Sequence, residues 1–504
     1  MNRREFLEGS LGAVVAAGAM AGRAGAGEAP DDGLISPRQA KLAVRPVMTN
    51  MVHTGVWEGP CRWRAIGVDQ ERANAEARFA GWPKQLAARL GQQPGVELLP
   101  AVHVTFDEQF KLTAEQAAKL TRDGRAPDVL FISPGGASVI AYDVARRLEK
   151  PMILEWGLNC RTVDIASYAR SMGVETFVPA GDEELRKLLV LLRARKVFRE
   201  TAVLFPTDRG LPPVASVSSI NDLADLEKRH GVRVVQIGYK ELAAEMDRAL
   251  GADAERAKAE EVADRLVRGA AHSYLDKGLV ARCVQFCHTA RKLMARHKCN
   301  AFTIECFEFC SSRLPERWKI TPCLTHTMLK DEGFASSCEA DLGGLLSMRL
   351  LMSVSGKSSH LGNTFLRPGG LLAINHSASG LRLNGFDQPG LPYKLGRFVS
   401  SGWGAKAVVD FTNNEEKRAT VVRIDPTASR MLVLRGTLEG SDGWEGDNLG
   451  CSVEARIKPV EGRAEDFVRK QLDYGNHLIW TYGHYADEMR QLGEMLGMEV
   501  EVVG

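Results

Sequence analysis

The hydrophobic pattern changes its period along the chain, and this change limits the folds that the chain can adopt. Residues 42–196 alternate short apolar runs with segments of helical period, and the runs 96–101, 128–133 and 152–155 read as buried parallel strands. Beyond residue 356, β-rich runs are separated by Asn, Asp, Gly and Pro turns. The sequence therefore predicts an α/β architecture first and an antiparallel sheet or barrel last.

A second α/β unit is predicted between these two parts. Its expected elements are strands at 201–205, 232–237 and 302–307, and helices at 220–229 and 342–354. We therefore expect two Rossmann-like α/β domains, at 42–196 and 197–355, followed by an antiparallel β-rich, barrel-like domain with terminal helices at 356–504.

The first residues have the pattern of a targeting segment. The pair Arg3 and Arg4 precedes an apolar, Gly/Ala-rich stretch at 11–22, and Ala24-Gly25-Ala26 offers a small-residue cleavage site. We expect a twin-arginine signal peptide at residues 1–26 and export to the periplasm. The alternative is a cytoplasmic protein whose N-terminal arginines have no such role.

The charge balance argues against two classes of partner. Lys and Arg total 65 against 63 acidic residues, a formal balance of +2, so no bulk attraction to nucleic acid or to anionic membranes is expected. The apolar stretch at 11–22 is shorter than the roughly 20 residues that span a bilayer, so no stable membrane insertion is expected either.

Three polar residues stand at the ends of expected elements, within apolar sequence. Glu305 comes near the carboxyl end of the strand 302–307, where open α/β sheets bind ligands. Asp341 directly precedes an apolar helix, and His477 precedes the run Leu-Ile-Trp. Each also has a structural interpretation: a strand-end acid is often solvated, an Asp before a helix caps it, and a histidine beside an apolar run often lies in the core.

Three short motifs connect these residues. Residues 322–333 read Pro-Cys-Leu-Thr-His-Thr-Met-Leu-Lys-Asp-Glu-Gly, residues 338–341 read Cys-Glu-Ala-Asp, and residues 475–477 read Gly-Asn-His. At these motifs, and in its expected domain order, the chain resembles the L-fucose isomerase family. The resemblance implies a metal-dependent sugar isomerase that interconverts an aldose and a ketose through an enediol intermediate.

The resemblance also implies roles for individual residues. The metal ligands would be Glu305, Asp341 and His477, and the two carboxylates would also transfer the proton between the first two carbons of the sugar. Asn476 would contact the sugar. By similarity to the related arabinose isomerases, His376 would be a sugar contact or a fourth ligand, and a structural histidine is the alternative. This oxygen-rich ligand set suits Mn²⁺, or another divalent cation such as Mg²⁺.

Two other classes of function remain open from the sequence. Two α/β domains around a cleft also describe exported sugar-binding proteins, and the same acids could serve a metal-dependent hydrolase. The family resemblance further implies a homo-oligomer, either a trimer or a hexamer.

Overall fold

The computed structural model describes residues 33–59 and 62–504, so the expected signal at residues 1–26 lies outside the described residues. The chain divides into two compact units, residues 39–197 and residues 198–504, and the latter unit also includes the described residues up to Arg38. Within the described ranges, no helix is both long enough and apolar enough to cross a membrane.

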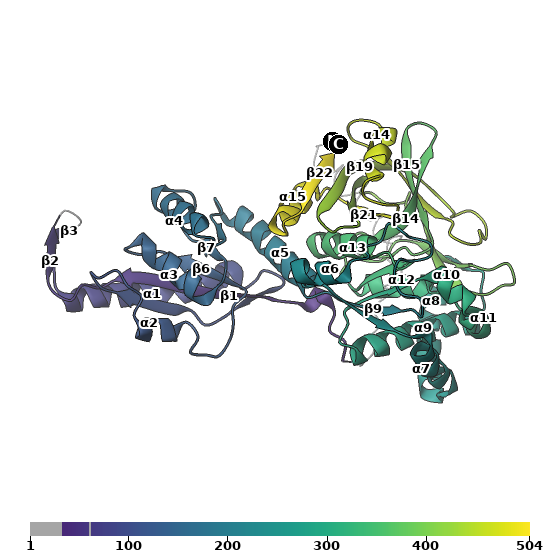
Figure 1. Cartoon of the computed structure of the whole chain (residues 1–504), viewed down its shortest axis with the longest axis horizontal. Helices are drawn as coiled ribbons and strands as arrows, with labels where there is room; N and C mark the ends of the chain where they lie inside the picture. Colours follow the sequence, from purple (N-terminus) through teal and green to yellow (C-terminus); the bar gives the residue numbers. More distant parts are fainter. Residues whose placement is uncertain (1–32, 60–61) are drawn as a thin grey trace, which may run out of the picture. The chain divides into compact units, whose positions relative to one another are not determined.

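The unit of residues 39–197 is built on a parallel sheet with the order β4-β1-β6-β7-β8, in which β5 also pairs with β1 (Figure 1). Its elements are β1 (Leu42–Met51), the hairpin β2 (Trp57–Gly59) and β3 (Arg62–Ile66), α1 (Val68–Leu90), β4 (Val96–Leu98), β5 (Val102–Phe106), α2 (Ala114–Lys119), β6 (Val129–Ser133), α3 (Ser138–Leu148), β7 (Met152–Leu154), α4 (Cys160–Ser171), β8 (Thr176–Phe177) and α5 (Asp182–Arg199). The expected strand at 96–101 is wrong in extent, since β4 ends at Leu98. Pro100 follows, and proline has no backbone N–H with which to continue the pairing of β4 with β1.

The unit of residues 198–504 begins with a second parallel sheet, of order β10-β9-β12-β13. Its elements are β9 (Ala202–Pro206), α6 (Leu223–His230), β10 (Arg233–Ile237), α7 (Tyr239–Gly251), α8 (Asp253–Gly269), α9 (Lys277–Arg296), β12 (Ala301–Ile304), α10 (Cys306–Ser311), α11 (Leu314–Trp318), α12 (Cys323–Asp331), β13 (Ala335–Cys338) and α13 (Leu342–Ser355). Leu204, Phe286 and Phe302 contribute to the core under this sheet.

The expected strand at 302–307 is also wrong at its C-terminal end. Strand β12 stops at Ile304, and Glu305 is the N-cap of α10, where its Oε2 accepts a hydrogen bond of 2.5 Å from the backbone N–H of Glu308. A side-chain acceptor at this position satisfies an N–H that the first helical turn leaves unpaired, which favours a helix directly after the strand.

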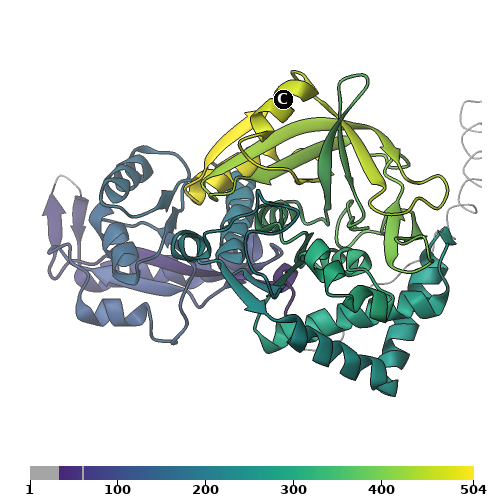
Figure 2. The same cartoon turned by 45° about the vertical axis from the view of Figure 1, so that its right-hand side comes forward.

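The C-terminal part is a closed antiparallel barrel of six strands. The order is β18-β21-β14-β15-β20-β19, and β19 pairs again with β18, which closes the ring (Figure 2). Its elements are β14 (His360–Arg367), β15 (Leu371–His376), β18 (Arg418–Ile424), β19 (Arg430–Asp442), β20 (Val453–Pro459), α14 (Ala464–Gln471), β21 (Leu478–Tyr482), α15 (Ala486–Met495) and β22 (Glu499–Val503), which runs parallel to β19. A separate small sheet joins β11 (His272–Ser273), β16 (Tyr393–Arg397) and β17 (Ala405–Val409). The predicted fold class, two α/β sheets followed by a barrel, is confirmed.

Helix α13 connects the second sheet to the barrel. It contacts β13 as well as the barrel strands β18 and β21. Every residue from Leu342 to Met352 is buried, in keeping with a helix that is apolar on all sides. The residues between β13 and the N-terminus of α13 are therefore buried inside this unit.

Candidate metal and substrate site

The candidate site lies where the edge of the second sheet meets the barrel. Strands β12 and β13 are parallel neighbours, with Ile304 paired to Cys338, so their carboxyl ends share one edge. Glu339 follows β13 directly. From the barrel, His376 ends β15, and His477 stands immediately before β21.

Three of these side chains form a group that could hold a metal ion. Ligand atoms of Glu339, His376 and His477 all lie within 4.8 Å of one another, and the three residues are buried. Glu339 Oε1 lies 3.4 Å from His376 Nε2, and its Oε2 lies 3.4 Å from His477 Nε2. One carboxylate thus faces two imidazoles.

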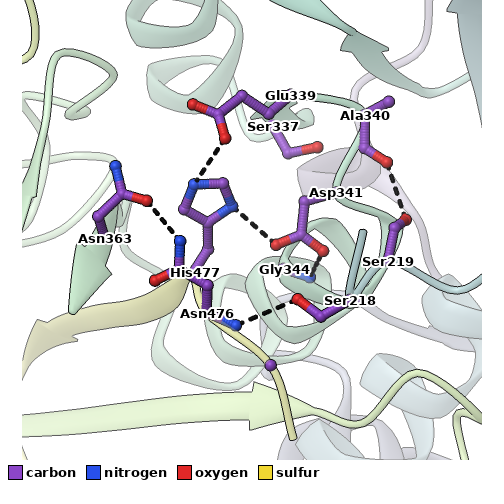
Figure 3. A network of polar contacts seen from close by, with 12 residues as sticks. Ser218, Ser219, Ser337, Glu339, Ala340, Asp341, Gly344, Asn363, Asn476 and His477 are labelled. Atoms are coloured by element: carbon purple, nitrogen blue, oxygen red, sulfur yellow. Dashed lines mark hydrogen bonds and ion pairs between the residues drawn. The ribbon is translucent and has the colours of Figure 1, made fainter. Parts of the chain in front are cut away.

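Asp341 holds the ring of His477 from the opposite side. Its Oδ2 lies 2.9 Å from His477 Nδ1, and Figure 3 shows the imidazole between the carboxylates of Glu339 and Asp341. Asp341 Oδ1 accepts from the backbone N–H of Gly344 at 3.0 Å and caps α13, while Oδ2 also accepts from Arg423. Asp341 therefore caps helix α13, as its structural interpretation predicts, and it also contacts His477.

The backbone between β13 and α13 makes this arrangement possible. Glu339 and Ala340 both have positive φ, 58° and 49°, a conformation that costs non-glycine residues about 1–3 kcal/mol each. The hydroxyl of Ser219 secures the turn: it donates to Ala340 O at 2.8 Å and accepts from Leu342 N at 3.0 Å (Figure 3). This turn separates the side chains of Glu339 and Asp341 so that they reach opposite nitrogens of one ring.

Opposite charges in and beside the group stabilise the charged forms of Asp341, His376 and Cys451 and shift their pKa values. Burial alone raises the pKa of Asp341, but Arg423 and His477 outweigh it and hold that pKa well below its usual range. Burial likewise opposes the charged form of His376, yet the Cys451 thiolate and Glu339 raise its pKa to about 10. Cys451 shows the reciprocal effect: burial raises the pKa of its thiol, and His376 more than offsets this, to about 7.

Glu305 lies near this group without belonging to it. Its side chain is buried, and Oε1 has no hydrogen-bond partner in the described structure, while Oε2 caps α10. Burial raises the pKa of Glu305, and the neighbouring carboxylate of Glu339 adds to the effect. A buried carboxyl with one free oxygen and a raised pKa is suited to accepting and returning a proton.

Asn476 directly precedes His477 at the edge of the group, and its side chain is exposed. Its Nδ2 donates to Asn363 Oδ1 at 2.6 Å, and its backbone N–H donates to Ser218 Oγ at 3.2 Å (Figure 3). These neutral amide and hydroxyl groups are able to hydrogen-bond the hydroxyls of a sugar.

The structure therefore brings four of the five predicted positions to one place: Asp341 contacts His477, His376 joins them through Glu339, and Asn476 is the chain neighbour of His477. Metal ligation by Glu305 and Asp341 stays a prediction. The residue that sequence reasoning missed is Glu339. The motif Cys-Glu-Ala-Asp contains two acids, so the sequence offered Glu339 as a second candidate beside Asp341. The direction of the Glu339 side chain, however, depends on the positive-φ turn, which the sequence does not reveal.

The residues present fit a divalent cation. The ionised Asp341 can only accept, so Nδ1 of His477 carries a proton, and Nε2, which faces Glu339, is the ring nitrogen left to bind an ion. This Nε2 is buried and has no hydrogen-bond partner among the described residues. A lone pair that faces a carboxylate is stabilised by a cation between them, and this nitrogen and oxygen donor set suits Mn²⁺, Mg²⁺ or a related ion.

Comparison with known proteins finds a distant, partial match to a sugar isomerase. No family model matches the chain. Over 241 residues it is 26% identical to the sulfoquinovose isomerase of Alkalicoccus urumqiensis, an alignment that covers 45% of this chain and 49% of that protein. The chain thus spans about half the length of the curated relative it matches. It is a distant, partial homologue of a sugar isomerase.

Proposed function

We propose that this chain is a metal-dependent sugar isomerase, similar to L-fucose isomerases, which interconverts an aldose and a ketose through an enediol. The observation that carries the proposal is the buried group Glu339, His376 and His477, oriented by Asp341. The distant relationship to a sugar isomerase supports the same reaction class. A protein that only binds sugar has no need of such a group, and nothing in the geometry favours a hydrolase over an isomerase.

Glu339, His376 and His477 would hold the cation, and Asp341 would fix the ring of His477. When bound, Mn²⁺ or another divalent cation polarises the sugar carbonyl and stabilises the negative charge that develops as the proton leaves carbon. Both oxygens of Asp341 already have partners, Gly344 on Oδ1 and Arg423 and His477 on Oδ2, so we assign this residue a positioning role.

Glu305 is the proposed acid–base residue. Its free Oε1 takes the proton from the carbon beside the carbonyl and returns it to the neighbouring carbon, and its raised pKa brings the acid and base forms closer in energy near neutral pH. Asn476 and its neighbours Asn363 and Ser218 are proposed to bind sugar hydroxyls. Assembly into a trimer or hexamer, and export through the twin-arginine pathway, remain predictions from the sequence.

The test combines metal analysis with a panel of aldoses. Purified protein, stripped and reloaded with Mn²⁺ or Mg²⁺, is incubated with aldoses that include L-fucose, L-arabinose and sulfoquinovose, and ketose formation is measured. We expect turnover of at least one aldose, dependent on the cation. The Glu339→Gln variant should lose both cation binding and turnover.

Glu316→Gln is the matched control, because Glu316 is exposed on α11 and pairs only with Arg313 at the surface among the described residues. It should behave as wild type. Cation-independent turnover, or an active Glu339→Gln variant, would contradict the proposed site.

A further inference from the structure

A second cluster of metal-ligating atoms adjoins the site, and the proposed reaction does not use it. Ligand atoms of Cys306, Cys338 and Glu339 lie within 4.8 Å of one another. Cys338 and Glu339 are buried, and Cys306 is half-buried. Glu339 therefore belongs to both clusters.

The fold places these two cysteines together from distant parts of the sequence. Cys338 is the last residue of β13, and its register partner on the parallel strand β12 is Ile304. Cys306 comes two residues after Ile304 and is the first residue of α10. The carboxyl ends of neighbouring parallel strands thus deliver both thiols to the same sheet edge as Glu339.

The chemistry of this cluster differs from that of the first. Two thiolates and a carboxylate prefer a thiophilic divalent cation such as Zn²⁺, whereas the imidazole and carboxylate group also suits harder ions. Two sulfurs on one tetrahedral Zn²⁺ lie about 3.8 Å apart, given Zn–S bonds of about 2.3 Å. Atoms already within 4.8 Å reach that geometry by small side-chain rotations.

We propose that Cys306, Cys338 and Glu339 form a second cation position, selective for a thiophilic divalent ion such as Zn²⁺, which shares the Glu339 carboxylate with His376 and His477. The inference does not depend on isomerase activity. Each oxygen of Glu339 faces one histidine. An ion at the cysteines would bind one of these oxygens, and the other oxygen would remain available to an ion held by the histidines.

Co²⁺ serves as the probe, because thiolate ligation gives it an intense near-ultraviolet charge-transfer band that oxygen and nitrogen ligands do not produce. The full-length, metal-free protein is kept reduced with a phosphine that does not bind metal, and it is titrated with Co²⁺. We expect the band to appear in the wild type, to disappear on addition of Zn²⁺, and to be lost in Cys306→Ser and Cys338→Ser.

Three variants assign the band. Cys310→Ser is the matched control, because Cys310 lies on the same short helix as Cys306 but outside the cluster, and the band should persist. It should also persist in His376→Asn, which removes a ligand of the other group only. A band lost in Cys451→Ser and kept in Cys306→Ser would assign the thiolate elsewhere and overturn the proposal.

The wild-type spectrum is decisive even if a variant fails to fold. Co²⁺ that binds without a charge-transfer band, or a protein that binds no Co²⁺, would overturn the second position. Turnover with Mn²⁺ is measured on the same preparation. Failure of the second cation position can therefore be distinguished from failure of the proposed isomerase reaction.

Discussion

Arg423 on barrel strand β18 forms a fully buried ion pair with Asp341, 82 positions earlier in the sequence, with Nη1 and Oδ2 2.5 Å apart. The guanidinium also donates to the backbone carbonyls of Tyr474 at 2.9 Å and Ser218 at 2.9 Å. One barrel arginine therefore positions the cap of α13, the segment before β21 and the carboxylate that orients His477.

The first prediction concerns this ion pair. Asp341→Asn keeps an oxygen that can cap α13 but leaves the buried charge of Arg423 uncompensated, so the free energy of unfolding should fall by about 3–5 kcal/mol. Urea denaturation measures the loss. The control is Asp387→Asn, which removes an exposed partner of Arg38 and should change stability little.

A double variant tests the cause of that loss. If the unpaired charge of Arg423 is responsible, Asp341→Asn combined with Arg423→Met should cost less than the sum of the two single changes. Strictly additive losses would show that Asp341 stabilises the fold without its partner.

The second prediction is a dependence on acid pH. The folded-state pKa of Asp341 lies below its ordinary value of 3.8, so its contribution is present above that value and is lost as pH falls towards the folded pKa. The difference in unfolding free energy between wild type and Asp341→Asn should therefore be constant above about pH 5 and shrink below about pH 4. A difference that grows in acid would contradict the assignment.

The third prediction concerns the thiol of Cys451. Cys451 is exposed as a residue although its thiol lies against the buried His376, and its pKa of about 7 leaves a large thiolate fraction at neutral pH. Iodoacetamide at pH 7 should modify it at least about 100-fold faster than Cys310, which is also exposed but whose pKa burial raises to about 11. Peptide mass spectrometry over time gives both rates in one sample.

The cause of that reactivity is tested by His376→Asn in the metal-free protein, because a bound cation would take the place of the proton on His376. Without the imidazolium, the pKa of Cys451 should rise and its alkylation at pH 7 should slow towards that of Cys310. Equal rates in wild type and variant would remove His376 as the activating group.

The fourth prediction separates proton transfer from cation binding. Glu305→Gln keeps an amide oxygen able to cap α10 but cannot accept a proton, so turnover should fall by about 10²–10⁴-fold. Thermal stability and Mn²⁺ affinity should stay close to wild type, because Glu305 lies outside the Glu339, His376 and His477 group. A parallel loss of Mn²⁺ affinity would instead support the sequence-based prediction that Glu305 is a metal ligand.

The fold class could be predicted from the sequence, because the hydrophobic period is a local property that can be recognised without knowledge of long-range contacts. Apolar runs such as those of β6 and β9 are buried in parallel sheets, and the change of pattern after residue 356 corresponds to the barrel. The motifs also placed Asp341, His477 and Asn476 near one another.

The roles of individual side chains in the site depend on contacts that form only in the folded chain. Which acid of Cys-Glu-Ala-Asp faces the histidines depends on the positive-φ turn at Glu339 and Ala340, and nothing in that tetrapeptide requires non-glycine residues to adopt it. The pairing of Asp341 with Arg423 depends on how the barrel packs against α13. The turn and the pairing are both stabilised by contacts between residues more than 80 positions apart, and no local pattern encodes such contacts.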